Sequence, residues 1–380
     1  MINPKRLADT FLALVRIDSV SKEEKQVADY LVPILESLNC QVRFDDAHTY
    51  TGSNVGNMIA RYPGNRAVPP LFFSGHMDTV EPGRGIEPVL ENGVFSSKGE
   101  TILGADDKSA IAIMIEVLRV IEAHQLPCGP LELILTVCEE IGLQGAKHLD
   151  LSQIESRMGY VLDSTETDGI VTRAPGANHL TITVHGKSAH AGAEPEKGVN
   201  AIAIAATAIS KLKLGRIDAV TTCNIGTIRG GEATNIIPDT VILEGEIRSH
   251  DPEMLDRVTN TMVSAFESAA AEASAHCKGD STRPRVTVHV ETDFPQTHIP
   301  EDDPVVVLAR RAAARLGRTM AAKTIGGGSD ANILLSNGIM AGVIGTGMTD
   351  VHTTHETVSL KNMIETAELV LAMIDLHAHA

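Results

Sequence analysis

The sequence has 380 residues, of which 43% are hydrophobic and 21% are charged. This length exceeds the size at which one hydrophobic core usually stops growing, so two domains are expected, and the composition is typical of a globular chain rather than a disordered one. The formal net charge of -17 argues against nucleic acid or an anionic membrane as a partner, because both require a basic surface.

Cysteine spacing and the distribution of apolar residues indicate the compartment. The five cysteines are far apart and form no CxxC pair, so we expect neither a disulfide framework nor a thiolate zinc site. The N-terminus lacks the apolar core of a signal peptide, and the alanine-rich run from Ala201 is interrupted by Lys211 and Lys213, which excludes a membrane span there. We therefore predict a cytoplasmic protein.

The first third of the chain alternates between helical and strand patterns. Helices are expected at residues 4–17 and 21–39, and Ser21 followed by Glu24 matches a capping box at the start of the second. Short apolar runs at residues 70–75, 131–137 and 159–162 are typical of buried strands, and a helix follows residues 104–109.

Acidic or imidazole side chains follow each of these three strands. His76 comes after the first, Glu139 and Glu140 after the second, and Asp163 after the third. Strands that alternate with helices predict a mostly parallel α/β sheet, in which sites form at the carboxyl ends of the strands. We therefore expect these four side chains to meet at one edge of the sheet.

The pattern changes at about residue 177. The expected order is strand, helix, two strands, helix and strand, at residues 179–185, 199–213, 221–228, 241–247, 252–275 and 285–290, which is the order of a ferredoxin-like unit. We predict an inserted α+β domain at residues 178–294 and a discontinuous catalytic domain at residues 1–177 and 295–380. The last elements expected are helices at 304–316 and after 326–330, a strand at 338–345 and a helix at 360–377.

The candidate metal ligands are imidazoles and carboxylates. Zinc binds these groups where thiolates are absent, and paired ions about 3.5–4 Å apart are a known arrangement for hydrolysis. Two zinc ions with Asp106 as bridging ligand are expected to bind His76, Asp106, Glu140, Asp163 and His352. Asp78 lies two residues after His76 and is expected to accept its other imidazole N–H, which would fix the tautomer.

The adjacent glutamates can have different roles. Neighbouring residues of an extended strand point to opposite faces, so one carboxylate can bind metal while the other takes a proton from water. We predict that Glu140 is the ligand and Glu139 the general base.

Six segments together resemble a known superfamily. They are SGHMDTV at 74–80, GADDK at 104–108, CEEIG at 138–142, SAHAG at 188–192, GGSDA at 327–331 and HTTHE at 352–356. In this order they resemble the co-catalytic zinc aminopeptidase, aminoacylase and glutamate carboxypeptidase superfamily and, within it, peptidase T-like proteins.

The resemblance implies how the ligands divide between the ions. One zinc would be held by His76, Asp106 and Asp163, and the other by Asp106, Glu140 and His352, with Co²⁺ or Mn²⁺ as possible substitutes. A cis peptide is implied between Asp106 and Asp107. The superfamily's last ligand is a histidine four residues before a glutamate, which selects His352 because Glu356 follows it, and His355 is the alternative.

The resemblance also implies substrate contacts and assembly. The inserted domain is expected to act as a lid and to form a homodimer, with His190 stabilising the oxyanion and Asn235 and Arg248 binding substrate. Gly328 and Ser329 are expected to bind substrate from the other domain. The alternatives are that His190 caps a turn beside Gly192 and that Arg248 forms a structural salt bridge, since arginine pairs equally well with a substrate or a protein carboxylate.

The expected activity is hydrolysis of short peptides by an aminopeptidase that acts on tripeptides. Within the superfamily, the alternatives are an N-acyl-amino-acid deacylase and a carboxypeptidase. A non-catalytic peptide-binding protein is the alternative from another class.

Overall fold

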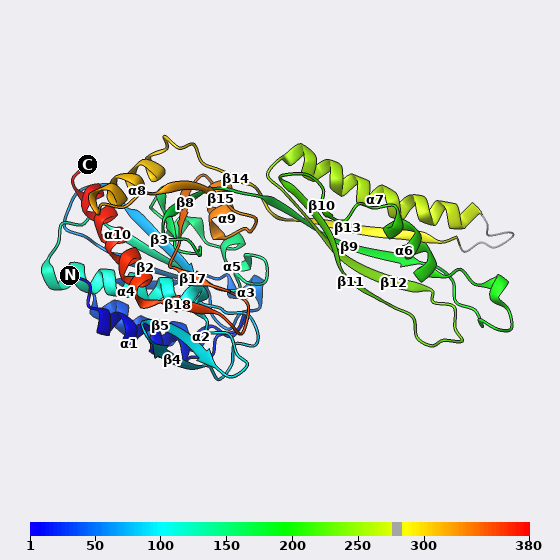
Figure 1. Ribbon diagram of the computed structural model, residues 1–380, viewed down its shortest axis with the longest axis horizontal. Helices are drawn as coiled ribbons and strands as arrows, with labels where there is room; N and C mark the ends of the chain where they lie inside the picture. The colour runs from blue at the N-terminus through cyan, green and yellow to red at the C-terminus, as the bar shows by residue number, and fades with distance from the viewer. Residues whose placement is uncertain (276–282) are drawn as a thin grey trace. The chain divides into compact units, whose positions relative to one another are not determined.

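The computed structural model describes residues 1–275 and 283–380, which form two compact units (Figure 1). Unit 1 consists of Met1–Ala174 and Thr297–Ala380, and unit 2 of Pro175–Gln296. Unit 1 contains a mixed sheet whose central strands are parallel, and unit 2 is an α+β insertion. The fold class expected from the sequence is therefore confirmed.

The main sheet of unit 1 is parallel at its centre and antiparallel toward its edges. β6, β3, β7 and β16 are parallel neighbours, and their side chains are almost all buried because helices cover both faces. The strand order is β1 (Gln41–Phe44), β2 (Met58–Tyr62), β6 (Leu131–Thr136), β3 (Leu71–His76), β7 (Met158–Val161), β16 (Met340–Ile344), β8 (Gly169–Ala174) and β14 (Thr297–His298), and β15 (Ala321–Thr324) also pairs with β8.

Helices pack on both faces of this sheet. The larger apolar core holds α1 (Pro4–Val15), α2 (Lys25–Ser37), α4 (Ala105–His124), α8 (Pro304–Arg315) and α10 (Leu360–Ala378). A smaller core on the other face includes residues of α9 (Asp330–Ser336), which contacts α5 (Gln144–Lys147). The short helix α3 (His48–Thr51) lies beside α5. This three-layer arrangement leaves the carboxyl ends of the parallel strands to be closed by loops.

A second, antiparallel sheet of unit 1 supports one of these loops. Its strands, in order, are β17 (Met348–Thr349), β18 (Thr357–Ser359), β5 (Val94–Lys98) and β4 (Glu87–Glu91). β17 and β18 are paired, so they anchor both ends of the loop that contains His352.

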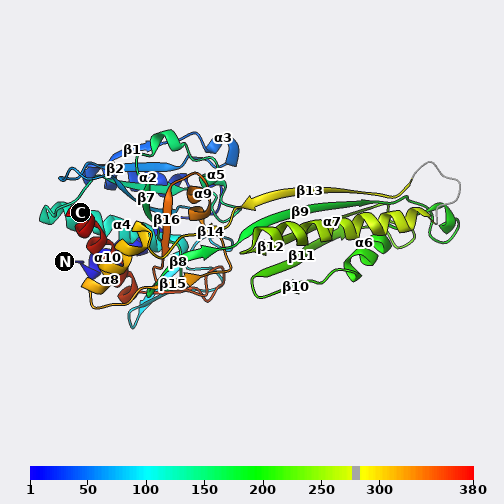
Figure 2. The ribbon, with the colours of Figure 1, turned by 90° about the horizontal axis from the view of Figure 1, so that it is seen from above.

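Unit 2 has the ferredoxin-like order predicted from the sequence. Its elements are β9 (Gly176–His185), α6 (Ala201–Ser210), β10 (Gly215–Arg216), β11 (Thr221–Gly230), β12 (Thr240–Ser249), α7 (Pro252–Ala275) and β13 (Arg285–Phe294). The sheet order is β10-β11-β12-β9-β13, with every pair antiparallel. Figure 2 shows α7 lying along this sheet, where α6 and α7 bury a separate apolar core.

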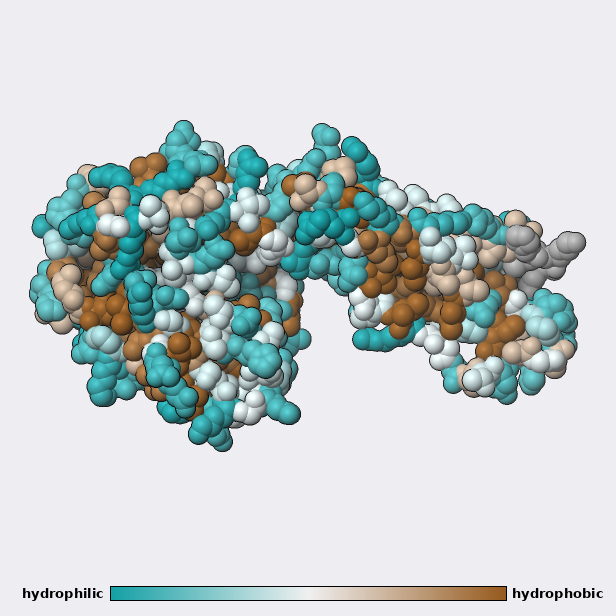
Figure 3. Space-filling model, viewed as in Figure 1, coloured by the Kyte–Doolittle hydropathy of each residue, from teal (hydrophilic) through white to brown (hydrophobic). Residues whose placement is uncertain are grey.

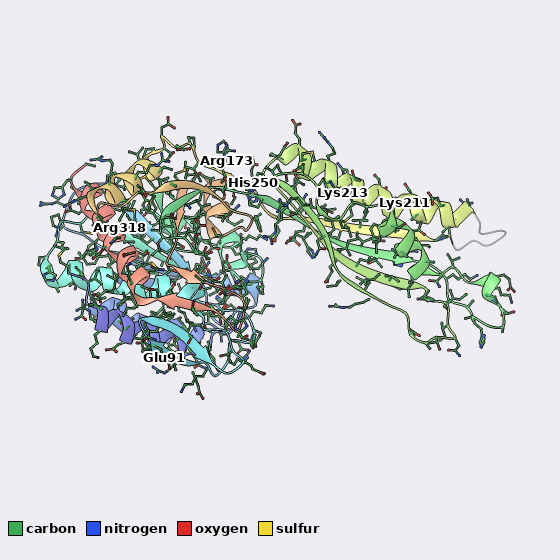
Figure 4. All side chains as sticks on the ribbon, viewed as in Figure 1. Glu91, Arg173, Lys211, Lys213, His250 and Arg318 are labelled. Atoms are coloured by element: carbon green, nitrogen blue, oxygen red, sulfur yellow. The ribbon has the colours of Figure 1, made fainter. Side chains whose placement is uncertain are left out.

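The surface of unit 2 has exposed apolar side chains and an ion pair between its helices α6 and α7. Figure 3 shows hydrophobic residues on the visible face of this unit, and its exposed large apolar side chains include Ile202, Ile228 and Ile242. Lys211, labelled in Figure 4, donates to Glu272 at 2.7 Å and so joins the end of α6 to α7.

The second helix begins later than the sequence pattern predicts. α2 starts at Lys25, the Ser21 hydroxyl donates to Asp78 instead, and Glu24 at the N-cap position makes no capping hydrogen bond. The predicted capping box is therefore wrong, because the Ser21 hydroxyl donates to Asp78 and the Glu24 carboxylate accepts the N–H groups of Lys22 and Cys138.

Four of the five cysteines lie in the described part of the chain. Cys40, Cys128, Cys138 and Cys223 are buried free thiols, and Cys277 lies outside the described residues. Among the described helices, none combines the length and the apolar character that spanning a bilayer requires.

Candidate metal centre

Three parallel strands of the main sheet and one loop of the second sheet deliver side chains to the same place. His76 is the last residue of β3, Glu139 and Glu140 follow the end of β6, and Asp163 follows the end of β7. His352 lies in the loop after β17, beyond β16. The carboxyl ends of the strands are where sites of parallel α/β sheets form.

Asp106 lies between the two histidines. Its Oδ1 is 3.0 Å from His76 Nε2, and its Oδ2 is 3.2 Å from His352 Nε2. His352 Nε2 is also 2.9 Å from Glu140 Oε2. A carboxylate that offers one oxygen to each side has the arrangement required of a ligand that bridges two ions.

Two overlapping groups of candidate ligands share His76. In one, ligand atoms of His76, Asp106 and Glu140 lie within 4.8 Å of one another; in the other, the same holds for His76, Asp107 and Asp163. The structure thus brings the five ligands expected from the sequence to one place and adds Asp107. No motif singled out Asp107 as a ligand, since the resemblance named only Asp106 of that pair.

The loop with two histidines brings one of them to the carboxylates of the cluster. His352 is half exposed, and its Nε2 faces two carboxylates. His355 is also exposed, and its backbone N–H donates to Thr353. His352 has a positive φ of 62°, which directs the backbone sharply at that point.

The segment before Asp106 is held by Glu356. The buried Glu356 carboxylate accepts the backbone N–H groups of Leu103 and Gly104, each at 2.8 Å, and that of Asp106 at 3.0 Å. The peptide between Asp106 and Asp107 is cis, as the resemblance implies. Sequence reasoning used Glu356 only as a spacing marker and missed this contact.

Asp78 supports the glutamates more directly than the imidazole. His76 Nδ1 is 2.9 Å from the Asp78 carbonyl oxygen and 3.4 Å from its Oδ1. The carboxylate instead accepts the backbone N–H of Glu139 at 3.0 Å and of Glu140 at 3.2 Å. The expected carboxylate–imidazole contact is therefore secondary to a backbone contact that the sequence pattern did not predict.

Burial makes negative charge costly for several carboxylates of this cluster. It raises the pKa of Glu139 and of Asp163 well above the usual range, and it also raises the pKa of Glu140. Asp106 differs: burial again raises its pKa, but hydrogen bonds with His352 and His76 bring the pKa below its usual value.

Both imidazoles hold protons tightly in this acidic surrounding. Burial lowers the pKa of His76, but its hydrogen bonds with Asp106 and Asp78 raise that pKa well above 6.5. Hydrogen bonds with Asp106 and Glu140 raise the pKa of His352 to about 10. Metal binding would therefore displace protons from both rings.

The donor set fits divalent metal ions. Imidazole nitrogen and carboxylate oxygen are suitable ligands for such ions, and thiolates are absent from the two groups described above. The buried Glu140 Oε1 has no hydrogen-bond partner among the described residues, which leaves it available as a ligand oxygen. A cation would also offset the cost of burying several carboxylates together.

The glycine-rich loop leads into α9 beside this cluster. Ser329 is buried, and its backbone N–H donates to Asn332 at 3.0 Å, while Gly328 is half-buried. The next residue, Asp330, accepts a hydrogen bond at 2.5 Å from Thr136, the last residue of β6. Substrate contacts of Gly328 and Ser329 stay predictions.

Unit 2 brings two of its three candidate residues together. His190 Nδ1 accepts the backbone N–H groups of Gly192 at 3.2 Å and Ala193 at 3.0 Å, so the ring does cap a turn, with its Nε2 turned to donate. The Ala191 N–H donates to the Asn235 carbonyl at 2.9 Å, which places the two segments side by side.

Arg248 is the third candidate residue of unit 2. Its guanidinium donates to Glu246 at 2.7 Å and lies 5.8 Å from the centre of the Phe294 ring. The structural salt bridge considered from the sequence is thus present, and a substrate role for Arg248 stays a prediction.

Family models match two segments of the chain. Residues 57–189 match the model for peptidase family M28, and residues 172–274 match the model for the peptidase dimerisation domain of the M20 type. The first segment contains the expected metal ligands except His352, and the second contains His190, Asn235 and Arg248.

Whole-length relatives agree with both matches. The chain is 42% identical over 376 residues, 99% of each chain, to the uncharacterized protein YqjE of Bacillus subtilis. The solved structure of the aminopeptidase PepT of Bacillus cereus is 41% identical, with a TM-score of 0.88, and a Staphylococcus aureus tripeptidase is 38% identical, with a TM-score of 0.91; each match covers 100% of both chains. The chain therefore belongs to the peptidase T-like proteins of the co-catalytic zinc aminopeptidase, aminoacylase and glutamate carboxypeptidase superfamily of metallopeptidases.

Proposed function

We propose that this protein is a two-zinc aminopeptidase that removes the N-terminal residue of tripeptides. The observation that carries the proposal is the pair Glu139 and Glu140, in which one buried carboxylate joins the ligand cluster while its neighbour stays beside it. Similarity to an aminopeptidase and to a tripeptidase supports the choice of substrate.

The ligands divide as the Asp106 geometry favours. His76, Asp106 and Asp163 would hold one ion, and Asp106, Glu140 and His352 the other. When bound, such ions polarise the scissile carbonyl and lower the pKa of water toward about 7. Zinc is favoured over Mg²⁺ or Ca²⁺ because two of the ligands are imidazoles.

Glu139 acts as the proton carrier. Its Oε2 lies 4.0 Å from His76 Nε2, so the carboxylate faces the cluster without a close contact to that ring. Burial raises its pKa, which strengthens the carboxylate as a base for the attacking water and later allows it to protonate the leaving amine.

Unit 2 supplies the remaining polar groups. With its Nδ1 occupied by two backbone N–H groups, His190 can donate from Nε2 to the oxyanion of the tetrahedral intermediate. Arg248 would bind the α-carboxylate of the substrate in a bidentate pair, and Asn235 would donate to the peptide. These contacts would select short peptides with a free C-terminus.

The protein is proposed to act as a cytoplasmic homodimer. The match to a peptidase dimerisation domain and the exposed apolar side chains of unit 2 support self-association. Light scattering of the purified chain tests this point, with a mass near 40 kDa indicating a monomer and twice that mass a dimer.

A substrate panel tests the activity. We expect the zinc-loaded protein to cleave a free tripeptide and release its N-terminal residue, and to leave the N-acetylated tripeptide intact. Preference for N-acyl-amino acids would indicate a deacylase, release of the C-terminal residue would indicate a carboxypeptidase, and binding without cleavage would indicate a peptide-binding protein.

A single variant tests the role of Glu139. Glu139→Gln keeps the shape of the side chain but removes the base, so we expect kcat to fall about 10²- to 10⁴-fold at unchanged metal content. A Glu139→Gln protein that keeps its full rate contradicts the proposed mechanism.

A further inference from the structure

The segment that carries the two glutamates is held by side chains from the first 78 residues. β6 ends at Thr136, and the four backbone N–H groups that follow each donate to a side-chain oxygen rather than to another strand. These hydrogen bonds run from Val137 to Asn57 Oδ1 at 3.1 Å, from Cys138 to Glu24 Oε1 at 3.0 Å, from Glu139 to Asp78 Oδ1 at 3.0 Å and from Glu140 to Asp78 Oδ2 at 3.2 Å.

One residue of this segment has an unfavourable backbone conformation. Cys138 has a φ of 53°, in the left-handed region that disfavours residues with a Cβ, and it directly precedes the proposed base. Such a conformation persists only where the surroundings determine it. The hydrogen bond accepted from the Cys138 N–H holds this strained residue, while Asp78 holds the N–H of Glu139 itself, so both contacts help to set the direction of Glu139.

Glu24 accepts the Cys138 N–H and makes other contacts from a fully buried position. Besides the Cys138 N–H, its carboxylate accepts the Ser53 hydroxyl at 2.5 Å and the Lys22 N–H at 2.9 Å. The Cys138 thiol is 3.4 Å from the same Oε1.

The position of Glu24 in the chain makes this use of its carboxylate unexpected. It is the N-cap residue of α2, yet its side chain does not cap that helix, and Asn54 accepts the Lys25 N–H at 2.8 Å instead. The carboxylate is thus turned from its own helix toward a loop 114 residues away. A fully buried carboxylate that binds hydrogen-bond donors of another segment stabilises the conformation of that segment.

We infer that Glu24 is a positioning residue that holds the backbone of Cys138 and thereby aims the Glu139 carboxylate at the reacting centre. Glu24 itself is fully buried and does not touch the substrate. This inference rests on the proposed function of Glu139. It gives the N-terminal segment around Glu24 a part in catalysis although that segment contributes neither a metal ligand nor a substrate contact.

Two variants of Glu24 separate hydrogen bonding from mere bulk. Glu24→Ala removes the acceptor, so we expect kcat for tripeptide hydrolysis to fall about 10- to 100-fold, with KM and the two-metal content unchanged. Glu24→Gln keeps one oxygen for the Cys138 N–H, so we expect its kcat to stay within about threefold of the parent protein.

Glu132 provides a matched control in the same unit. Its buried carboxylate also accepts backbone N–H groups, from Glu155 at 3.1 Å and Ser156 at 2.8 Å, but it lies at the start of β6 rather than beyond its end. Glu132→Ala should lower the melting temperature as Glu24→Ala does, with kcat unchanged. Equal losses of kcat in the two alanine variants would overturn the positioning role.

Amide hydrogen exchange tests the inference independently of activity. Exchange at residues 138–140 should become faster in Glu24→Ala and stay at the parent rate in Glu132→Ala. If the parent protein proves inactive on peptides, the proposed function fails, whereas the exchange result still supports or overturns the role of Glu24. If Glu24→Ala does not fold, Ser53→Ala loosens the same carboxylate, and unchanged exchange and kcat in that variant would overturn the inference.

Discussion

The two ends of β6 carry buried carboxylates in opposite situations. Near its start, Glu132 pairs with Arg61 at 3.0 Å and accepts the Ser156 N–H at 2.8 Å. Beyond its end, Glu140 has one buried oxygen without a partner among the described residues, and the pKa of Glu139 is raised by burial. The same residue type in the same layer of the fold is satisfied at one end and unsatisfied at the other.

This difference separates structural carboxylates from functional ones. A buried charge that the chain itself compensates contributes to stability, and removing its partner is costly. A group of buried acids that the chain does not compensate lowers stability unless a cation binds, and natural proteins retain such groups at functional sites. Buried carboxylates whose charge no other residue compensates therefore indicate the site even without a sequence motif.

Removal of the bridging carboxylate should have the largest effect. Asp106→Ala takes away the oxygen that each histidine faces, so we expect loss of both metal ions and a fall in kcat of more than about 10³-fold. Elemental analysis of the dialysed protein and a tripeptide assay measure both effects. Glu155→Ala is the control. It removes an exposed carboxylate that pairs with Arg61, near the start of β6, and should keep both ions.

The two histidines of the 350–356 loop give a matched pair of variants. His352→Ala should reduce the metal content from two ions to one and lower kcat about 10²- to 10³-fold, because His352 faces Asp106 and Glu140. His355→Ala should change neither quantity because, unlike His352, its ring pairs with no carboxylate of the described residues. The reverse result would assign the second ion to His355.

Arg248 and Arg61 extend the comparison between functional and structural groups from carboxylates to arginines. Unlike Arg61, which is committed to two structural carboxylates, Arg248 is proposed to bind the substrate as well as Glu246. We expect Arg248→Ala to raise KM about 10- to 100-fold with a smaller change in kcat, as for loss of a charge-assisted hydrogen bond.

A modified substrate identifies which group Arg248 binds. A tripeptide with a C-terminal amide should be a poor substrate for the parent protein and no worse for Arg248→Ala. If the variant loses affinity equally for both substrates, Arg248 does not bind the terminal carboxylate. Arg229→Ala, an exposed arginine of β11, is the control.

Local patterns predicted the parts of the site that lie next to buried strands. His76, Glu139, Glu140 and Asp163 follow apolar runs that do form β3, β6 and β7, and elementary sheet geometry brings such positions together. The ferredoxin-like order of unit 2 followed from the alternation of strand and helix patterns in the same way.

The supporting contacts had no local pattern. Glu356 binds backbone N–H groups about 250 residues away, and Glu24 binds Cys138 across 114 residues. A side chain that accepts from a distant backbone group is not marked by its neighbours in sequence, and Glu24 even fits a capping box that does not form. Long-range backbone contacts of buried acids therefore required the folded structure.

The smallest predicted effect is a pH dependence of stability that distinguishes the metal-free protein from the loaded one. The folded-state pKa of His352 is raised to about 10 and that of His76 is raised as well, so both bind more protons folded than unfolded above about pH 6.5. The raised pKa values of Glu139 and Asp163 act in the same direction. Stability gained from these groups is therefore lost as pH rises, whereas the lowered pKa of Asp106 adds a constant amount above about pH 4.

We expect the melting temperature of the metal-free protein to fall by several degrees between about pH 5 and about pH 9. Metal replaces the protons on both imidazoles, so the melting temperature of the zinc-loaded protein should depend less on pH. The difference in melting temperature between the zinc-loaded and the metal-free protein should therefore be larger at high pH. Differential scanning fluorimetry with a chelator and with excess zinc measures both curves. In the presence of chelator, His352→Ala should reduce the slope of melting temperature against pH. A melting temperature that rises with pH, or equal slopes with and without metal, would show that these acids and imidazoles do not form one proton-binding cluster.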